Sequence, residues 1–397
     1  MNSKMRAPGP SLWRTLLSAL ALAAFLVSCG GGGGVGEGGT GSFASGPISG
    51  FGSVHVSGIR FDTRGVASVQ WEDGEDPPLL SALQPGMVIA VEAGPIRTDA
   101  VGVRRAVAER LVLAGSLRGP VTDVQWLQRR LRVLGLPVRF NGATVFDEVL
   151  REQIRESGQL REQEVEIWGY VDRSSVVPEF VATFVASADG AAFYKARGFV
   201  RGVEGDVVQL GDELFDFSAV AGRPTVGDFV RLRVATAEPD PAWEVVAWAR
   251  IERQGFEEGR ELEIEGRVTA VVDANRFSVD GLPVVAAAAV PGLVEGSYVE
   301  VEGRWRDGAL QASEVELKSD DELEERRSEW EGAVSGFDAG LRRFTLTTDA
   351  GQRVGVVYDD QTEFDGGSAG ELGNGLRLEV KGTLRNGVLQ AEEIEFE

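Results

Sequence analysis

The sequence predicts an all-β protein, a tandem array of about five small five-stranded barrels after an N-terminal export signal and a glycine-rich tether. Two observations lead to this prediction. Five segments of the 397-residue chain repeat the same order of strand and turn signals. Within each repeat, apolar and polar residues alternate over about five short stretches, and a period of two is typical of half-buried β-strands.

Residues 1–28 have the properties of a signal peptide. Residues 16–27 read LLSALALAAFLV, an uncharged apolar run, and the only charges before it are Lys4, Arg6 and Arg14. This run is too short to span a bilayer comfortably as a helix, but its length suits the core of a signal peptide. We therefore expect an exported protein.

The sequence around the single cysteine is more specific. Leu26, Val27, Ser28 and Cys29 resemble the lipobox of bacterial lipoproteins. In that family the thiol receives a diacylglyceryl group, the signal is cut before the cysteine, and the new amino terminus is acylated. The resemblance implies that Cys29 is the lipid attachment residue, and two or more acyl chains anchor a protein stably. The alternative is an ordinary secretory signal with a chance cysteine.

Residues 29–45 are dominated by glycine and predict a flexible tether between the anchor and the folded body. Gly30 follows the cysteine in place of Asp. In lipoproteins this usually implies export to the outer membrane, with the body facing the periplasm or the cell surface, and the leaflet stays open.

The composition excludes several classes of partner. The whole chain has a net charge of −22, and cleavage before Cys29 would leave 37 basic and 62 acidic residues, a net charge of −25. Because an acidic surface repels phosphate backbones, we expect no nucleic-acid partner. A lipidated Cys29 also leaves no thiolate for a metal site, and we expect no cofactor.

The five repeats are spaced by 73, 79, 68 and 66 residues, counted from matching strands at Ile48, Val121, Val200, Val268 and Val334. The predicted units 1 to 5 span residues 46–113, 114–189, 190–254, 255–318 and 329–397. Five strands in such a unit, with a loop or helix before the fourth, favour an OB-like barrel, while an SH3-like barrel or a small sandwich stays open. Each unit is expected to contact mainly its neighbours in sequence.

Local signals predict further details. The insertion FDEVLREQIRESG in unit 2 predicts a helix capped by Asp147, with Val149, Leu150 and Ile154 at helical spacing and Gly158 at its end. Residues 319–328 predict a charged helical linker that begins with a capping box at Ser319 and Glu322. The tripeptides RDG at 306–308 and RNG at 385–387 predict type I′ hairpin turns.

The opening of unit 1 carries a family resemblance. The segments GPISGFGSVHVSGIRFDTRG and LQPGMVIAVEA resemble the start of bacterial lipoproteins built from DUF5666-type repeats. The resemblance continues more weakly to Glu397 and is most specific in unit 1. It implies an OB-like β fold and a location in the cell envelope. The family has no settled activity, so no catalytic residue is carried over.

The sequence does not favour an enzyme. His55 is the only histidine, and it lies on an alternating strand far upstream of Ser368, the serine of the one GxSxG match. That match lacks the long helix that follows the nucleophile in hydrolases. The alternative is an envelope hydrolase that uses carboxylates in a cleft between units.

Metal binding is supported only weakly. Asp73, Glu75 and Asp76 form an acidic loop with oxygen ligands that suit calcium, but without the spacing of an EF-hand. A solvated acidic loop is the simpler interpretation. A second alternative function is therefore a calcium-stiffened structural spacer.

Aromatic residues indicate where a partner could bind. Trp71, Trp126 and Trp305 fall on predicted loops or strand ends and could stack on a sugar ring, whereas three others fall in strand patterns and are expected in cores: Trp168, Trp243 and Trp248. A basic cluster, Arg129, Arg130 and Arg132, could touch a neighbouring unit or an anionic polymer. We therefore expect a non-catalytic, lipid-anchored envelope protein that binds a protein or glycan. The oligomeric state stays open.

Overall fold

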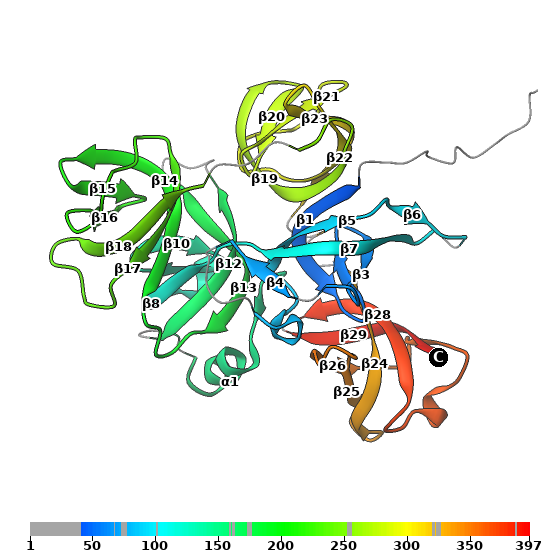
Figure 1. The fold of residues 1–397 in the computed structure, drawn as a ribbon. Helices are drawn as coiled ribbons and strands as arrows, with labels where there is room; N and C mark the ends of the chain where they lie inside the picture. Colours follow the sequence, from blue (N-terminus) through cyan, green and yellow to red (C-terminus); the bar gives the residue numbers. More distant parts are fainter. Residues whose placement is uncertain are drawn as a thin grey trace, which may run out of the picture. The chain divides into compact units, whose positions relative to one another are not determined.

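The computed structural model describes residues 41–66, 68–72, 78–100, 102–158, 160, 163–172, 177–251, 256–319, 322, 327–385 and 387–397. These residues form one compact body (Figure 1). The predicted signal peptide, the four residues from Leu26 to Cys29, and the acidic residues Asp73, Glu75 and Asp76 lie outside the described residues. Within the described part of the chain, no helix is long and apolar enough to cross a membrane.

Each unit contains five main strands. In unit 1 these are β1 (Ser42–Gly50), β2 (Val54–Val56), β3 (Ile59–Asp62), β5 (Val88–Ala93) and β7 (Arg104–Leu113). In unit 2 they are β8 (Leu117–Gln125), β9 (Arg130–Val133), β10 (Leu136–Arg139), β12 (Glu164–Asp172) and β13 (Glu179–Ser187). In unit 3 they are β14 (Tyr194–Glu204), β15 (Val207–Leu210), β16 (Glu213–Asp216), β17 (Phe229–Val234) and β18 (Trp243–Arg250).

Units 4 and 5 follow the same plan. Unit 4 has β19 (Glu261–Asp273), β20 (Arg276–Val279), β21 (Leu282–Ala286), β22 (Tyr298–Arg306) and β23 (Ala309–Lys318). Unit 5 has β24 (Arg327–Asp338), β25 (Arg343–Thr347), β26 (Arg353–Val357), β28 (Arg377–Arg385) and β29 (Val388–Phe396). Shorter strands extend the sheets: β4 (Val69–Trp71), β6 (Arg97–Thr98), β11 (Val145–Phe146) and β27 (Glu363–Asp365).

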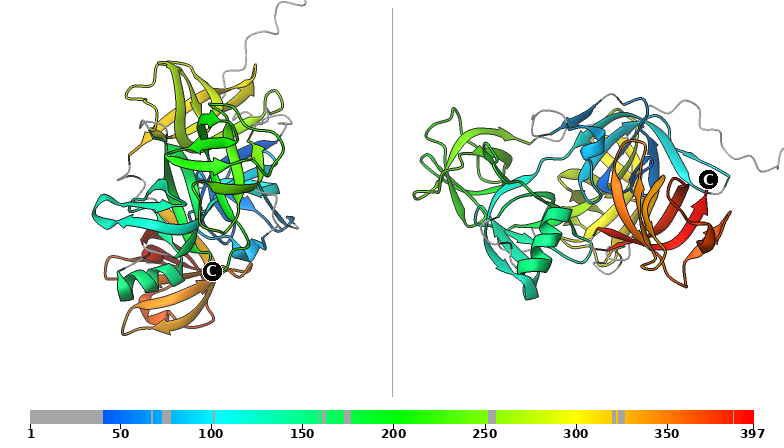
Figure 2. Two further views of the ribbon diagram at one scale, coloured as in Figure 1. Left: turned by 90° about the vertical axis from the view of Figure 1, so that its left-hand side faces the viewer. Right: turned by 90° about the horizontal axis from the view of Figure 1, so that it is seen from below.

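The pairing of these strands forms a closed ring in each unit. In unit 5, β24 pairs with β25 and β28, β25 pairs with β26, β26 runs parallel to β29, and β29 pairs with β28. Units 2, 3 and 4 repeat this order of pairing. In unit 1 the ring is closed by β7, which runs parallel to β3 and antiparallel to β5. Figure 2 shows the barrels from two further sides. The predicted all-β array of small OB-like barrels is confirmed.

One glycine recurs in the fourth strand of units 2, 4 and 5, at Gly169, Gly303 and Gly382. Each lies at a β-bulge, where the register between the fourth and fifth strands shifts by one residue. A Cβ atom at these positions would lie 2.0, 2.1 and 1.9 Å from a carbonyl oxygen of the neighbouring strand. The bulge therefore requires glycine, because any side chain would collide with the backbone.

The predicted helix of unit 2 is present as α1 (Glu148–Ser157). The Asp147 side chain accepts a hydrogen bond from the Leu150 amide, and Gly158 ends the helix in the left-handed conformation. Leu150 is buried, and Ile154 packs partly against the core. Val149, however, is 58% exposed, so it does not belong to the buried face.

Two predicted boundaries differ from the structure. Strand β1 begins at Ser42, so the last residues of the predicted tether belong to a sheet, where they pair with 261–264. At the other boundary, β24 begins at Arg327 inside the predicted helical linker. Most of that linker lies outside the described residues, but Ser319 and Glu322 make the hydrogen bonds of a capping box. The hairpin at Asp307 and Gly308 has positive φ at both residues, as the sequence predicts.

The units also pair with units that are distant in sequence. Residues 42–45 of β1 run parallel to 261–264 of β19, which joins units 1 and 4. Phe51, just after β1, forms a parallel bridge with Trp330 of β24, which joins units 1 and 5. The expectation that each unit mainly contacts its sequence neighbours is therefore wrong. The cores reflect this, because one hydrophobic cluster contains the buried residues of both units 1 and 5.

Candidate functional site

The three tryptophans predicted to stack on a ligand do not form one site. Trp71 lies on β4, and the Lys195 ammonium covers its ring at 3.9 Å from the centroid. The Trp126 indole donates a hydrogen bond to the Gly158 carbonyl (3.0 Å) and packs edge-on against Phe140. Trp305 is only 6% exposed and packs against Phe256.

The three rings pack in part against the chain itself, and their stacking on a ligand stays a prediction. The other three tryptophans behave more as predicted. Trp168 and Trp243 are buried in cores, and Trp248 is half-buried against one.

His55 belongs to a buried contact between units 1 and 5. Its Nδ1 atom lies 3.8 Å from a Glu329 oxygen, and Arg60 forms ion pairs with both Glu329 and Glu379. Burial, together with the nearby charge of Arg60, lowers the pKa of His55 to about 3. The imidazole is therefore neutral near pH 7 and lies among charges that hold two units together.

Ser368 has the environment of a turn residue. Its hydroxyl donates to a carboxylate oxygen of Glu371 (2.7 Å), at the start of the 3₁₀ turn η3 (Ala369–Glu371). Ser368 and Glu371 are only three positions apart in the sequence, on an exposed loop. This contact resembles local capping and supplies no general base of the histidine type.

The predicted basic cluster is partly neutralised within the chain. Arg130 pairs with Glu179 (2.9 Å), and Arg132 approaches Asp212 (3.8 Å). Across the described residues, no group of three or more His, Cys, Asp or Glu side chains has the geometry of a metal site.

A buried carboxylate lies between units 1 and 4. Glu263 on β19 is 1% exposed, and Arg104 of β7 forms an ion pair with it. Burial raises the pKa of Glu263, and a hydrogen bond with Glu300 raises it further, while Arg104 opposes these effects. This pair fixes a contact between barrels and is enclosed by protein.

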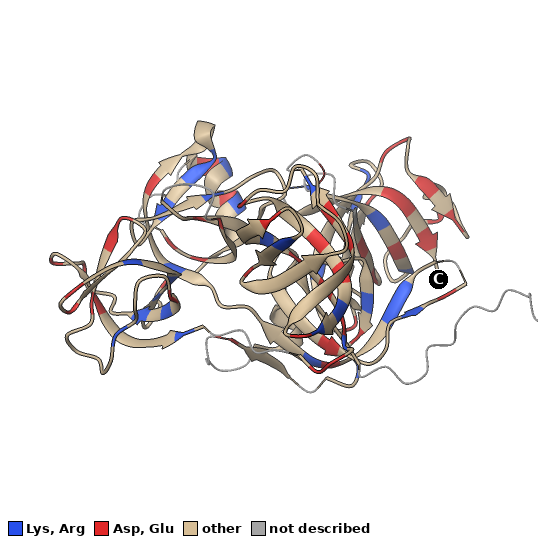
Figure 3. Cartoon of the chain, turned by 90° about the horizontal axis from the view of Figure 1, so that it is seen from above, with Lys and Arg blue, Asp and Glu red and all other residues tan. Residues whose placement is uncertain are grey.

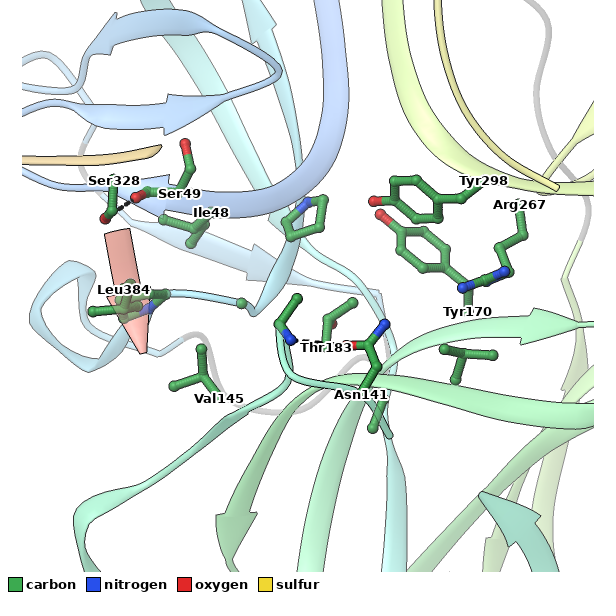
Figure 4. A pocket seen from close by; sticks show the side chains of 16 residues that line it. Ile48, Ser49, Asn141, Val145, Tyr170, Thr183, Arg267, Tyr298, Ser328 and Leu384 are labelled. Carbon is green, nitrogen blue, oxygen red and sulfur yellow. Dashed lines mark hydrogen bonds between the residues drawn. The ribbon is translucent and has the colours of Figure 1, made fainter. Parts of the chain in front are cut away.

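A small cavity forms where units 1, 2, 4 and 5 meet (Figure 4). Its volume is about 70 Å³, and its lining includes Ile48, Val145, Tyr170, Tyr298 and Leu384. The two tyrosine hydroxyls lie close together in Figure 4, and that of Tyr170 donates to the Glu265 carbonyl (3.1 Å). Ligand pockets usually have volumes of at least about 300 Å³. This cavity is therefore a gap in packing and not a site for a sugar or peptide.

A much larger groove also has Tyr170 in its lining. Its volume is about 640 Å³, and residues of units 1 to 4 line it. The apolar part of the lining includes residues from each of these units: Val88, Ala90, Phe180, Phe199, Phe229, Leu282 and Trp305. We call this cavity the aromatic groove. Its volume falls in the usual range of ligand sites.

Phe199 and Phe229 form the aromatic wall of the groove. They face each other across β14 and β17, with ring centroids 4.6 Å apart. Both rings are half-buried, so part of each surface stays accessible. Arg197 lies beside them, 5.4 Å from the Phe229 ring, and Glu72 approaches Arg197 at 3.7 Å. Aromatic faces with polar groups at their edge are suited to sugars and to peptide side chains.

The sequence pattern did not indicate that the two phenylalanines line a groove. Phe229 in FVRLRV and Phe199 in ARGFVRG both occupy the outward positions of alternating strands, which normally face solvent. The groove exists because other units stand over this face, and no local pattern encodes that approach. Trp305 is the one predicted tryptophan that lines the groove.

Comparison with family profiles finds a match in three of the five barrels. The profile of a domain of unknown function, DUF5666, matches residues 118–185, 265–316 and 331–395. These segments lie in units 2, 4 and 5, the three units with the bulge glycine. Unit 1 lies outside the matched segments, so the expectation that it carries the most specific resemblance is wrong.

Two further comparisons add little. No curated protein matches the chain. One similar solved structure is a multidomain protein with nucleic acid binding domains from Streptococcus pneumoniae TIGR4, at 14% identity over 51% of this chain and 73% of that one. The TM-score is 0.13, and so low a value supports no inference about fold or function. The three matched segments are consistent with a DUF5666 repeat-containing protein.

Proposed function

We propose that this chain is a non-catalytic, lipid-anchored protein of the cell envelope whose barrels bind a protein or glycan partner in the aromatic groove. The anchor is proposed from the resemblance of Leu26–Cys29 to a lipobox, and the outer membrane from Gly30. The groove supplies the binding site, and nucleic acid is not the proposed partner because the chain is acidic.

The groove between four units carries this proposal. It combines a volume of about 640 Å³ with the accessible ring surfaces of Phe199 and Phe229. The described carboxylate Glu72 accepts a hydrogen bond from the Gly115 amide (2.8 Å) and approaches Arg197. A carboxylate held by these two contacts is suited to positioning a ligand, not to transferring a proton. This supports binding more than hydrolysis.

The test uses the mature protein immobilised through its C-terminus and exposed to envelope proteins and to a panel of envelope glycans. Phe199→Ala and Phe229→Ala should each weaken capture of the same partner at least about tenfold. Val226→Ala is the matched control, because Val226 is an exposed apolar residue of the same unit, outside the groove lining. Capture that survives both phenylalanine variants would place the partner elsewhere. Hydrolysis of a captured glycan would reject the non-catalytic assignment.

A further inference from the structure

Five cations lie on the outward face of three adjacent strands in units 2 and 3. They are Arg118 on β8, Lys195 and Arg197 on β14, and Arg231 and Arg233 on β17. The register places Arg118 opposite Lys195, Lys195 opposite Arg233, and Arg197 opposite Arg231. The intervening Ala196 and Leu232 are buried in the core, so the cations share the other face. We call this set the cationic face.

This arrangement opposes the usual pairing preference of β-sheets. Like charges placed directly opposite each other on neighbouring strands destabilise the pair. Here three consecutive cross-strand pairs are cation against cation, in a chain whose net charge is −22. Figure 3 shows that acidic and basic residues are otherwise interleaved along the strands.

Carboxylates of the chain engage one side of the cationic face. Glu166 is buried, pairs with Lys195 (2.6 Å) and accepts a hydrogen bond from Ser116 (2.5 Å). Arg197 approaches Glu72, as described above. Arg231, in contrast, makes no ion pair with any residue that the structure describes, although it lies opposite another arginine.

A cavity of about 260 Å³ opens beside Arg231. Its lining includes Ser116, Lys195, Arg231, Arg233, Ala247 and Ala249. The two alanines lie opposite the arginines on β18, at Arg231↔Ala249 and Arg233↔Ala247. Their short side chains leave space next to the guanidinium groups. The Lys195 side chain, 4% exposed, also reaches this cavity, where its ammonium pairs with Glu166.

We propose that this cavity binds an anionic group, a carboxylate or a phosphate, carried by a sugar of an envelope glycan. Guanidinium groups bind both anions through paired, charge-assisted hydrogen bonds. The cavity is slightly smaller than a typical drug-sized pocket, which suits one charged sugar residue. Arg197 lines the aromatic groove and faces Arg231 across the strands, so a glycan in the groove could place its charged residue here. The inference therefore rests on the proposed function and specifies its ligand.

Charge distribution favours a short anionic glycan over nucleic acid. A long polyanion must also pass the acidic remainder of the surface, and strong non-specific binders of DNA neutralise about six to ten phosphates. The cationic face is confined to five residues, of which Arg118, Lys195 and Arg197 already contact carboxylates.

The experiment measures binding of labelled oligogalacturonate, neutral maltohexaose and a single-stranded DNA 12-mer by fluorescence anisotropy at 150 mM salt. Wild type should bind oligogalacturonate about tenfold more tightly than maltohexaose, and Arg231→Gln should remove that preference. Arg231→Lys should retain part of it. The matched control is Arg343→Gln, an exposed strand arginine in unit 5. Inorganic phosphate should compete with oligogalacturonate, and Arg233→Gln serves as a second variant if Arg231→Gln unfolds.

The outcomes separate this inference from the proposed function. Equal affinity for the charged and neutral glycans, or an unchanged preference in Arg231→Gln, overturns the anion site but leaves a neutral partner in the groove. Tighter binding of DNA than of oligogalacturonate overturns the choice of a glycan. If Phe199→Ala loses all glycan binding but still binds inorganic phosphate as wild type does, the aromatic groove and the cationic face are separate sites. The anion site then stands without the groove.

Discussion

Phe51 and Trp330 join the first and last barrels of the chain. Their ring centroids lie 5.1 Å apart, and the backbone at Phe51 exchanges hydrogen bonds with Glu329 and Glu331, on either side of Trp330. Trp330 is fully buried, so a side chain of unit 5 is enclosed partly by residues of unit 1. The two units share one core, although about 280 residues separate these side chains.

Trp330→Ala should destabilise the protein by about 3–5 kcal/mol, because it opens a large cavity in the shared core. Trp126→Ala should cost less, since Trp126 is half-buried on a surface turn. Urea unfolding followed by circular dichroism measures both. If Trp330→Ala cost no more than Trp126→Ala, the two units would not share a core.

Gly382→Ala should destabilise unit 5 by about 1–3 kcal/mol, because the new Cβ atom would collide with the Gln390 carbonyl. Gly355→Ala is the matched control in the same barrel, where a Cβ atom would meet no atom within 4 Å. Thermal unfolding monitored by circular dichroism should show a lower Tm for Gly382→Ala and little change for Gly355→Ala. Equal Tm values would mean that the bulge relaxes to accept a side chain.

His55 should make the protein sensitive to acid. Its pKa is about 3 in the folded state and near 6.5 when unfolded, so the unfolded chain binds more protons between these values. The stabilisation is complete above pH 6.5 and falls by about 1.4 kcal/mol for each pH unit below it, until about pH 3. His55→Gln should lose this part of the pH dependence. Urea titrations of both proteins from pH 7 to pH 4 test it, and parallel curves would show that His55 takes no proton on unfolding.

Cys29→Ser should abolish lipid attachment if the thiol is the acceptor. Cells fed a labelled fatty acid should incorporate label into the wild-type protein and not into the variant, which should stay uncut or leave the membrane fraction. Ser28→Ala, which keeps a small residue before the cysteine, serves as the control and should retain the label. Equal labelling of wild type and Cys29→Ser would reject the lipoprotein assignment.

Several features could be predicted because their signals are local. The Asp147 cap and the Gly158 stop determine α1, and Asp307-Gly308 determines a hairpin turn. The alternation of apolar residues determines which side of each strand faces its own barrel. These signals act within a few residues, so they survive whatever surrounds the unit.

The features that the sequence could not predict depend on what packs against the outer face of a strand, the face turned away from its own barrel. Glu263 and Glu265 alternate with Leu262 and Ile264, a pattern typical of a solvent-facing side, yet both glutamates are buried. A period of two separates the faces of a strand but cannot show that another unit packs against the polar one. The aromatic groove was missed for the same reason, because it forms where units from distant parts of the sequence meet. The cationic face was missed because the pairing of β8 with β14 joins two repeats, and no pattern within one repeat shows it.

The position of β1 has a mechanical consequence for a protein held by its N-terminus. Ser42 begins a strand that pairs with β5 on one side and β19 on the other, and that leads directly to Phe51. Tension applied through the preceding residues therefore enters at the strand that connects units 1, 4 and 5. In the proposed lipid-anchored protein, a pull along β1 would load its hydrogen bonds to both neighbouring strands together instead of breaking them one at a time.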